Sequence, residues 1–123
     1  MTSSQRTPKE DLLVGGLDDW ADAGWALQSA RLSGATDPVA LRDLTLSLIA
    51  EVLREGLMVP GDIVGGDHVP WHGSAQETAE RITREWVDEW GDEVPTPGAI
   101  VWLSNTEAGD EIARAVLARE AMA

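Results

Sequence analysis

The sequence of 123 residues contains no cysteine, no phenylalanine and no tyrosine. Without cysteine the chain can form no disulfide and can use no thiol chemistry, so we expect a protein of the reducing cytoplasm. It also lacks any apolar run close to the roughly 20 residues that cross a bilayer. The first residues, MTSSQRTPKED, have no apolar segment of the kind found in a secretory signal. The sequence therefore predicts a cytoplasmic protein with no membrane association.

Basic residues are scarce. There are 9 Lys and Arg against 22 Asp and Glu, which gives a formal net charge of −13, and no Lys or Arg occurs between Arg54 and Arg81. A field of this sign repels phosphate backbones and attracts basic partners, although an acidic balance can also serve solubility alone. We therefore expect a basic protein as partner and no nucleic acid.

The usual signs of an enzyme or a cofactor site are also missing. None of the serines lies in a nucleophile elbow, and the glycine pairs lack the lysine of a phosphate loop. The remaining constellation is HVPWH, in which His68 and His72 are four residues apart with Asp62, Asp67 and Glu77 nearby. A proline between the histidines argues against the helix that would place both rings on one face for a metal. We expect no metal, no cofactor and no enzyme, with His68 and His72 as the weak candidates for a metal-binding alternative.

The periodicity predicts about four helices after a disordered tail at residues 1–9, all within one globular domain at 10–123. Apolar residues at helical spacing indicate helices over 17–32 and 38–55. For the second, Thr36 or Asp37 can cap the start, Pro38 fits the first helical position and Gly56 ends it. SAQE at 74–77 is a capping box for a helix to about 90, and SNTE at 104–107 can cap the last one.

Short strands are predicted between these helices. The apolar pieces 57–59 and 63–64 flank a predicted turn at 60–62, a second turn follows at 65–67, and 68–71 is extended. The apolar run AIVWL at 99–103 has the length of a strand. The predicted fold is mainly α (α+β minor), with about four helices and a small β-hairpin or short sheet.

Two stretches, ALRDLTLSLIAEVLREGLMVPGDI and VWLSNTEAGDEIARAV, resemble winged helix-turn-helix proteins. In the second, Leu103, Thr106 and Gly109 stand where several regulator families have an L-T-x-x-G stretch closing the wing. The resemblance implies a winged-helix variant, because the helix predicted at 74–90 would interrupt the wing, and a transcriptional regulator that binds DNA. The absence of basic residues around the hairpin opposes that function.

Six tryptophans are the only aromatic rings apart from histidine. Trp20, Trp86 and Trp102 lie on apolar faces and are predicted to be core. Trp71 and Trp90 could either cover the edges of the core or be exposed and anchor a protein partner. The leading hypothesis is a non-enzymatic protein-binding module, similar in type to immunity proteins and antitoxins that neutralise basic toxins. Its candidate contact residues are Trp71, Trp90, Asp88, Glu89, Asp92 and Glu93.

Overall fold

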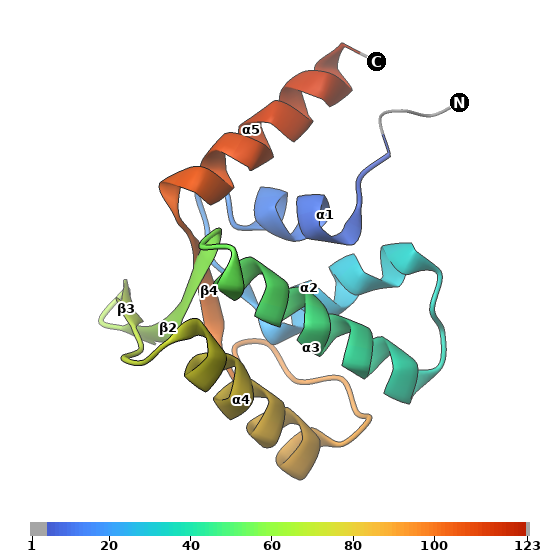
Figure 1. The fold of residues 1–123 in the computed structure, drawn as a ribbon, viewed down its shortest axis with the longest axis vertical. Coiled ribbons are helices and arrows are strands. Elements are labelled where there is room, and N and C mark those ends of the chain that lie inside the picture. The colour runs from blue at the N-terminus through green and yellow to red at the C-terminus, as the bar shows by residue number, and fades with distance from the viewer. Residues whose placement is uncertain (1–4, 123) are drawn as a thin grey trace.

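A computed structural model describes residues 5–122 and combines five α-helices with a four-stranded antiparallel sheet (Figure 1). The helices are α1 (Pro8–Gly15), α2 (Ala23–Ala30), α3 (Pro38–Arg54), α4 (Ala75–Glu85) and α5 (Glu107–Ala121). The strands are β1 (Ala21–Asp22), β2 (Met58–Val64), β3 (Asp67–Pro70) and β4 (Trp102–Asn105). A 3-10 turn, η1 (Arg31–Ser33), follows α2, and a π-helical turn, η2 (Trp86–Trp90), extends α4. The prediction of a helix-rich fold with a short sheet is confirmed.

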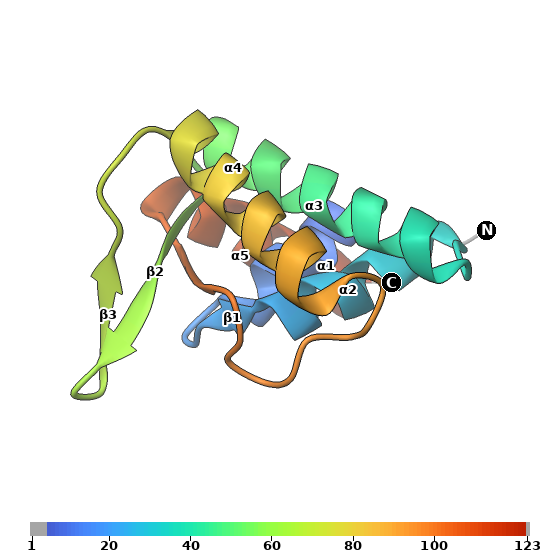
Figure 2. The ribbon, with the colours of Figure 1, turned by 90° about the horizontal axis from the view of Figure 1, so that it is seen from below.

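The sheet has the order β1-β4-β2-β3, so its two central strands come from distant parts of the sequence. The helices gather on one side of it (Figures 1 and 2). Ala21, Met58 and Leu103 point from the sheet toward the helices and are almost fully buried. We call this the inner face and the opposite one the outer face. The core lies between the inner face and the helices, centred on Leu12, Leu13, Ile49, Val52, Ile82 and Trp86.

The N-terminal expectations need correction. Helix α1 begins at Pro8, inside the segment predicted to be a disordered tail, and residues 1–4 lie outside the described residues. Thr7 and Glu10 form a capping box at its start, and Arg6 pairs with Glu120 of α5, so this part of the chain is held by local and distant contacts.

The helix predicted over 17–32 is also wrong in its first third, because α2 begins only at Ala23. Asp18 has a φ of 62°, and the backbone then extends through Ala21–Asp22 to pair with β4. The side chain of Asp22 accepts a hydrogen bond from the Trp25 amide at 2.9 Å and caps the helix. The acidic residues thus mark the helix start a turn later than predicted.

The predicted turn at 60–62 is wrong as well, since β2 runs unbroken from Met58 to Val64. Pro60 is tolerated in this central strand because its side toward β3 faces the end of that strand: its carbonyl accepts from the Trp71 amide at 2.9 Å. The hairpin turns instead at Gly65 and Gly66, whose positive φ values of 59° and 85° fit the second predicted turn.

The last strand begins later than the apolar run suggested. Ile100 has a φ of 73°, which breaks the extended backbone, so β4 starts at Trp102 rather than at residue 99. The helices α3, α4 and α5 begin at the predicted caps, Asp37, Ser74 and Thr106. None of the helices in residues 5–122 combines the length and apolarity needed to cross a membrane.

Candidate functional site: an acidic turn and the outer face of the sheet

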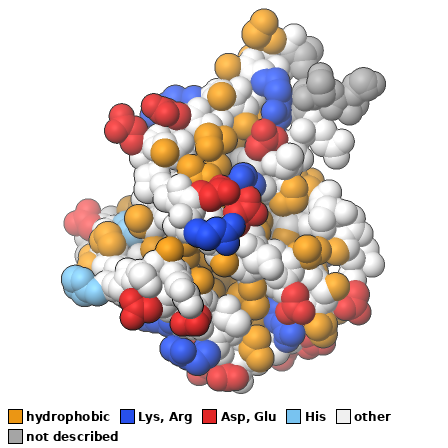
Figure 3. Space-filling view, in the orientation of Figure 1, with side chains coloured by type: hydrophobic (Ala, Val, Ile, Leu, Met, Phe, Trp, Pro, Cys, Tyr) orange, Lys and Arg blue, Asp and Glu red, His pale blue; other side chains and the backbone are white. Residues whose placement is uncertain are grey.

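Charge is distributed unevenly over the structure. Seven ion pairs occur among residues 5–122, and their acidic partners lie before residue 56 or after residue 106: Asp11, Glu120, Glu51, Glu55, Asp43, Asp110 and Glu10. Lys9 pairs with both Glu51 and Glu55, and Figure 3 shows acidic and basic side chains side by side near the middle of the face it presents. Residues 57–105 hold nine carboxylates and two arginines, a formal charge of −7, and contribute none of these pairs.

The densest group of these carboxylates lies on η2 and the loop after it. We call this group the acidic turn and define it as Glu85, Asp88, Glu89, Asp92 and Glu93. All but Glu85 are exposed. Burial, and then the neighbouring carboxylate of Glu89, raise the pKa of Glu85. Glu85 and Glu89 are therefore close enough to repel each other, and Arg81 offsets part of this repulsion at Glu85.

The backbone explains why these carboxylates project together. The Gly91 amide donates to the Trp86 carbonyl at 2.9 Å, five residues back, which widens the last turn of the helix. Trp86 is fully buried and Trp90 is half-buried against the core, so the widened turn directs its two indoles inward. The carboxylates between and after them are left in solvent. π-helical turns of this kind frequently mark functional sites.

Trp71 lies elsewhere. Its ring is half-buried beneath Arg81, whose guanidinium carbon is 3.5 Å from the ring centroid. Trp90 follows Arg81 by nine residues, roughly 13 Å at about 1.5 Å per residue of helix. The structure thus places Trp90 beside Asp88, Glu89, Asp92 and Glu93. Trp71 lies under Arg81, at the other end of a shallow hollow that Arg81 lines together with Asp88 and Glu89.

The two histidines differ in their surroundings: His68 is hydrogen-bonded within the sheet, and His72 is exposed. The Nε2 atom of His68 lies 2.9 Å from the carbonyl oxygen of Trp102, a distance at which the Nε2–H tautomer donates a hydrogen bond. His72 is exposed in the loop before α4. Among residues 5–122 no three His, Cys, Asp or Glu side chains are placed to hold a metal ion.

The outer face of the sheet carries aromatic residues that the sequence had assigned to the core. Trp20 and Trp102 are half-buried rather than buried, and the ring of Trp20 lies 6.4 Å from that of His68. The register places Trp102 opposite Gly61 and Ile63 opposite His68, all on this face. The signal available in the sequence was Gly61, since a glycine inside a strand often marks a close approach by another group.

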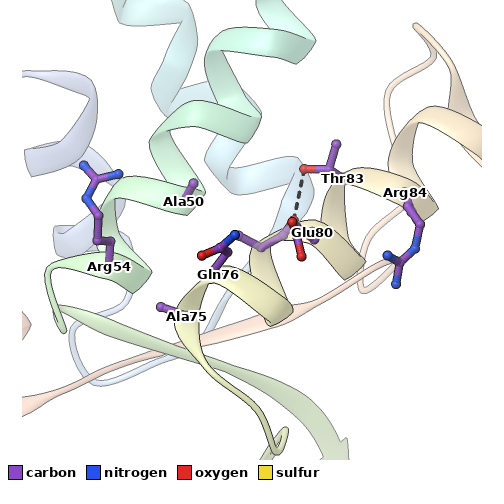
Figure 4. A pocket seen from close by; sticks show the side chains of 8 residues that line it. Ala50, Arg54, Ala75, Gln76, Glu80, Thr83 and Arg84 are labelled. Carbon is purple, nitrogen blue, oxygen red and sulfur yellow. Dashed lines mark hydrogen bonds between the residues drawn. The ribbon is translucent and has the colours of Figure 1, made fainter.

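A groove of about 720 Å³ lies between α3 and α4 (Figure 4). Its floor is formed by Ala50, Ala75 and Ala79, and Arg54 and Arg84 stand at its two ends. The two arginines and the intervening Glu80 give it mixed charge. A second, smaller hollow of about 380 Å³ lies at the acidic turn, between Arg81, Arg84, Glu85, Asp88 and Glu89, so Arg84 borders both hollows.

Comparisons of the chain with protein-family models, with curated proteins and with solved structures find no match.

Proposed function

We propose that this protein is a non-enzymatic binding module for a basic protein and that the acidic turn, with Trp90, forms the contact surface. One observation supports this function most directly: the five carboxylates of the acidic turn form no ion pair among residues 5–122 and outnumber the two arginines beside them, Arg81 and Arg84. Seven carboxylates before residue 56 or after residue 106 are paired. Basic side chains of a partner would supply the missing counter-charges.

Electrostatic reasoning gives this arrangement a use. Clustered charges of one sign accelerate the encounter with an oppositely charged partner and fix its orientation, while contributing less to the final affinity. The affinity would come from Trp90, because a large, partly exposed ring beside charged residues is typical of an interface hot spot. Trp90 is already packed on the core, so little conformational freedom is lost on binding.

A fitting biological role is neutralisation of a basic toxin, as performed by immunity proteins and antitoxins. An acidic surface on such an inhibitor captures the toxin rapidly and covers the cationic site that binds phosphate. DNA recognition by the hairpin is the competing function. The hairpin has no Lys or Arg between residues 55 and 80 and carries Asp62 and Asp67, which would repel a DNA backbone.

The test is affinity capture from the native cytoplasm, followed by measurement of the captured complex with two charge-matched variants. Glu89→Gln with Asp92→Asn removes two charges from the acidic turn. Glu107→Gln with Glu111→Gln removes two exposed charges from α5. We expect a stoichiometric basic protein whose association rate falls about tenfold with the first pair and much less with the second.

Two outcomes would contradict the proposal. Equal loss with both pairs would mean that only net charge matters, and the acidic turn would not be the contact surface. Recovery of nucleic acid alone, released by moderate salt, would favour the DNA-binding alternative.

A further inference from the structure

The outer face of the sheet is built around a gap in β2. A Cβ atom on Gly61 would lie 2.6 Å from the Cε1 atom of His68 and 2.3 Å from the Val69 carbonyl oxygen. The imidazole occupies this gap, reaches across β2 from the edge strand and meets the Trp102 carbonyl in β4 at 2.9 Å. Because the ring is held at that hydrogen bond and lies beside Trp20, the outer face presents a fixed aromatic surface rather than mobile side chains.

Charge on this face is also one-sided. No Lys or Arg occurs in β1, β2, β3 or β4, or in the loops at 16–20 and 91–101 that border them. Asp18 and Asp19 are exposed and directly precede Trp20 in the sequence. Aromatic faces and carboxylates both attract cations, and the planar guanidinium of arginine can stack on an indole while it bonds to a carboxylate.

The protein contains one such contact already. Arg81 stacks on Trp71 at 3.5 Å, and this is the one cation–π contact found among residues 5–122. Trp71 thus has a cation of its own, whereas Trp20 and Trp102 face an area of the sheet that contains none. The two half-exposed indoles of the outer face therefore match a cation brought by another molecule.

We propose that the outer face of the sheet, through Trp20 and Trp102 with the carboxylates of Asp18 and Asp19, binds arginine side chains of an extended segment. This deepens the proposed function, on which it rests for the source of the segment: the basic partner engages the acidic turn with its folded surface and the outer face with an arginine-bearing strand or tail. The chemistry of the face itself can be tested without the partner.

The test uses the whole protein and a short peptide, acetyl-Arg-Gly-Arg-Gly-Arg-amide, followed by NMR of the six indole Nε1–H signals. Signals are assigned through single Trp→Leu variants. We expect saturable shifts of the Trp20 and Trp102 signals, with the peptide of glutamate in place of arginine giving none. Trp102→Leu should weaken binding about fivefold, the factor expected for a contact on the order of 1 kcal/mol.

Trp25→Leu is the matched control, because Trp25 is 44% exposed yet lies on α2, over Gly15, away from the strands. It should change the dissociation constant less than twofold. Asp18→Asn with Asp19→Asn should weaken binding and flatten its salt dependence, and Glu89→Gln with Asp92→Asn should leave peptide binding within twofold. The last result separates the two proposals, since that pair is expected to slow capture of the folded partner.

Four results would overturn the inference: equal weakening by Trp25→Leu and Trp102→Leu, shifts by the glutamate peptide, tighter binding of the uncharged disaccharide cellobiose than of the arginine peptide, or no saturable shift at all. Should Trp102→Leu unfold the protein, the series of arginine, lysine, glutamate and uncharged peptides on the wild-type chain still decides the question. Loss of peptide binding with intact capture of a basic protein would refute only the role of the outer face.

Discussion

Gly109 is predicted to be essential for packing although it lies in a helix, where alanine is intrinsically favoured. It is buried in the first turn of α5, and its amide donates to the Thr106 hydroxyl oxygen at 3.2 Å. A Cβ at this position would lie 2.2 Å from the carbonyl oxygen of Leu57, where an ordinary contact begins at 3.4 Å. Helix α5 would have to move by about 1 Å to admit the extra methyl group.

The magnitude follows from competing contributions. Alanine gains about 1 kcal/mol of helix propensity over glycine. Overpacking costs about 1–3 kcal/mol. The displacement also stretches two hydrogen bonds from Thr106, its amide to the Leu57 carbonyl at 3.0 Å and its hydroxyl to the Gly56 carbonyl at 2.7 Å, each worth about 0.5–1.5 kcal/mol. Steric and hydrogen-bond losses win, and Gly109→Ala should lower the free energy of unfolding by about 3 kcal/mol.

Urea denaturation followed by circular dichroism measures this change, which corresponds to a midpoint shift of roughly 2 M. Gly24→Ala in α2 is the matched control, because a Cβ there would lie 3.6 Å from its nearest neighbour, the Oδ1 atom of Asp22, which is an ordinary contact. That variant should be unchanged or more stable by up to about 1 kcal/mol. If Gly109→Ala were as stable as Gly24→Ala, the close approach of α5 to Leu57 would be wrong.

Three further substitutions probe other contacts. The hydrogen bond from Arg119 lowers the pKa of Glu10, so the ionised Glu10 stabilises the fold above its ordinary pKa of 4.5. This stabilisation is lost as the pH falls through the lowered pKa of the folded protein. Arg119→Gln should therefore lose less stability than wild type on acidification, and equal losses in urea titrations would refute this. Arg81→Gln removes the cation above Trp71 and should cost about 0.5–1 kcal/mol with a change in Trp fluorescence; an unaltered emission spectrum would show that the contact does not persist in solution. Gly61→Ala should destabilise by about 1–3 kcal/mol and speed amide exchange in β2 and β3, whereas unchanged exchange would contradict the close approach across the strand.

Local signals predicted the helices that have clear caps. Asp37, Pro38 and Gly56 bound α3 in the structure as expected, and the Ser74–Glu77 capping box starts α4. The same signals were present before α1, where Thr7, Pro8 and Glu10 spell a capping box with a proline at the first helical position. The segment was predicted to be a disordered tail because it is polar. It is ordered in the structure, where Arg6 pairs with the distant Glu120 of α5.

The candidate site depended on long-range pairing and was harder to predict. Trp20 and Trp102 have core-like sequence neighbours, but they are half-buried because β1 and β4 pair with each other and direct both side chains to the face without helices. Nothing near His68 in the sequence indicates that its ring crosses Gly61 to reach β4, which is 34 residues away. The sequence identified Trp71 and Trp90 as candidates but could not predict the distance between them, because that distance is set by the length of α4 and η2.

The distribution of ion pairs indicates that the clustering of carboxylates in the acidic turn needs an explanation other than solubility. Solubility requires only net charge, and carboxylates scattered over the surface would supply it with little mutual repulsion. Here three of the bases form ion pairs elsewhere: Arg6 and Arg119 join α1 to α5, and Lys9 joins α1 to α3. Only Arg81 and Arg84 lie beside the acidic turn. Burial and the neighbouring Glu89 raise the pKa of Glu85, so its ionised form is disfavoured in the isolated protein; on the proposed function, a basic partner would relieve this. If the proposed partner binds these carboxylates, it should also stabilise the folded state, because a ligand that binds only the folded protein shifts the folding equilibrium.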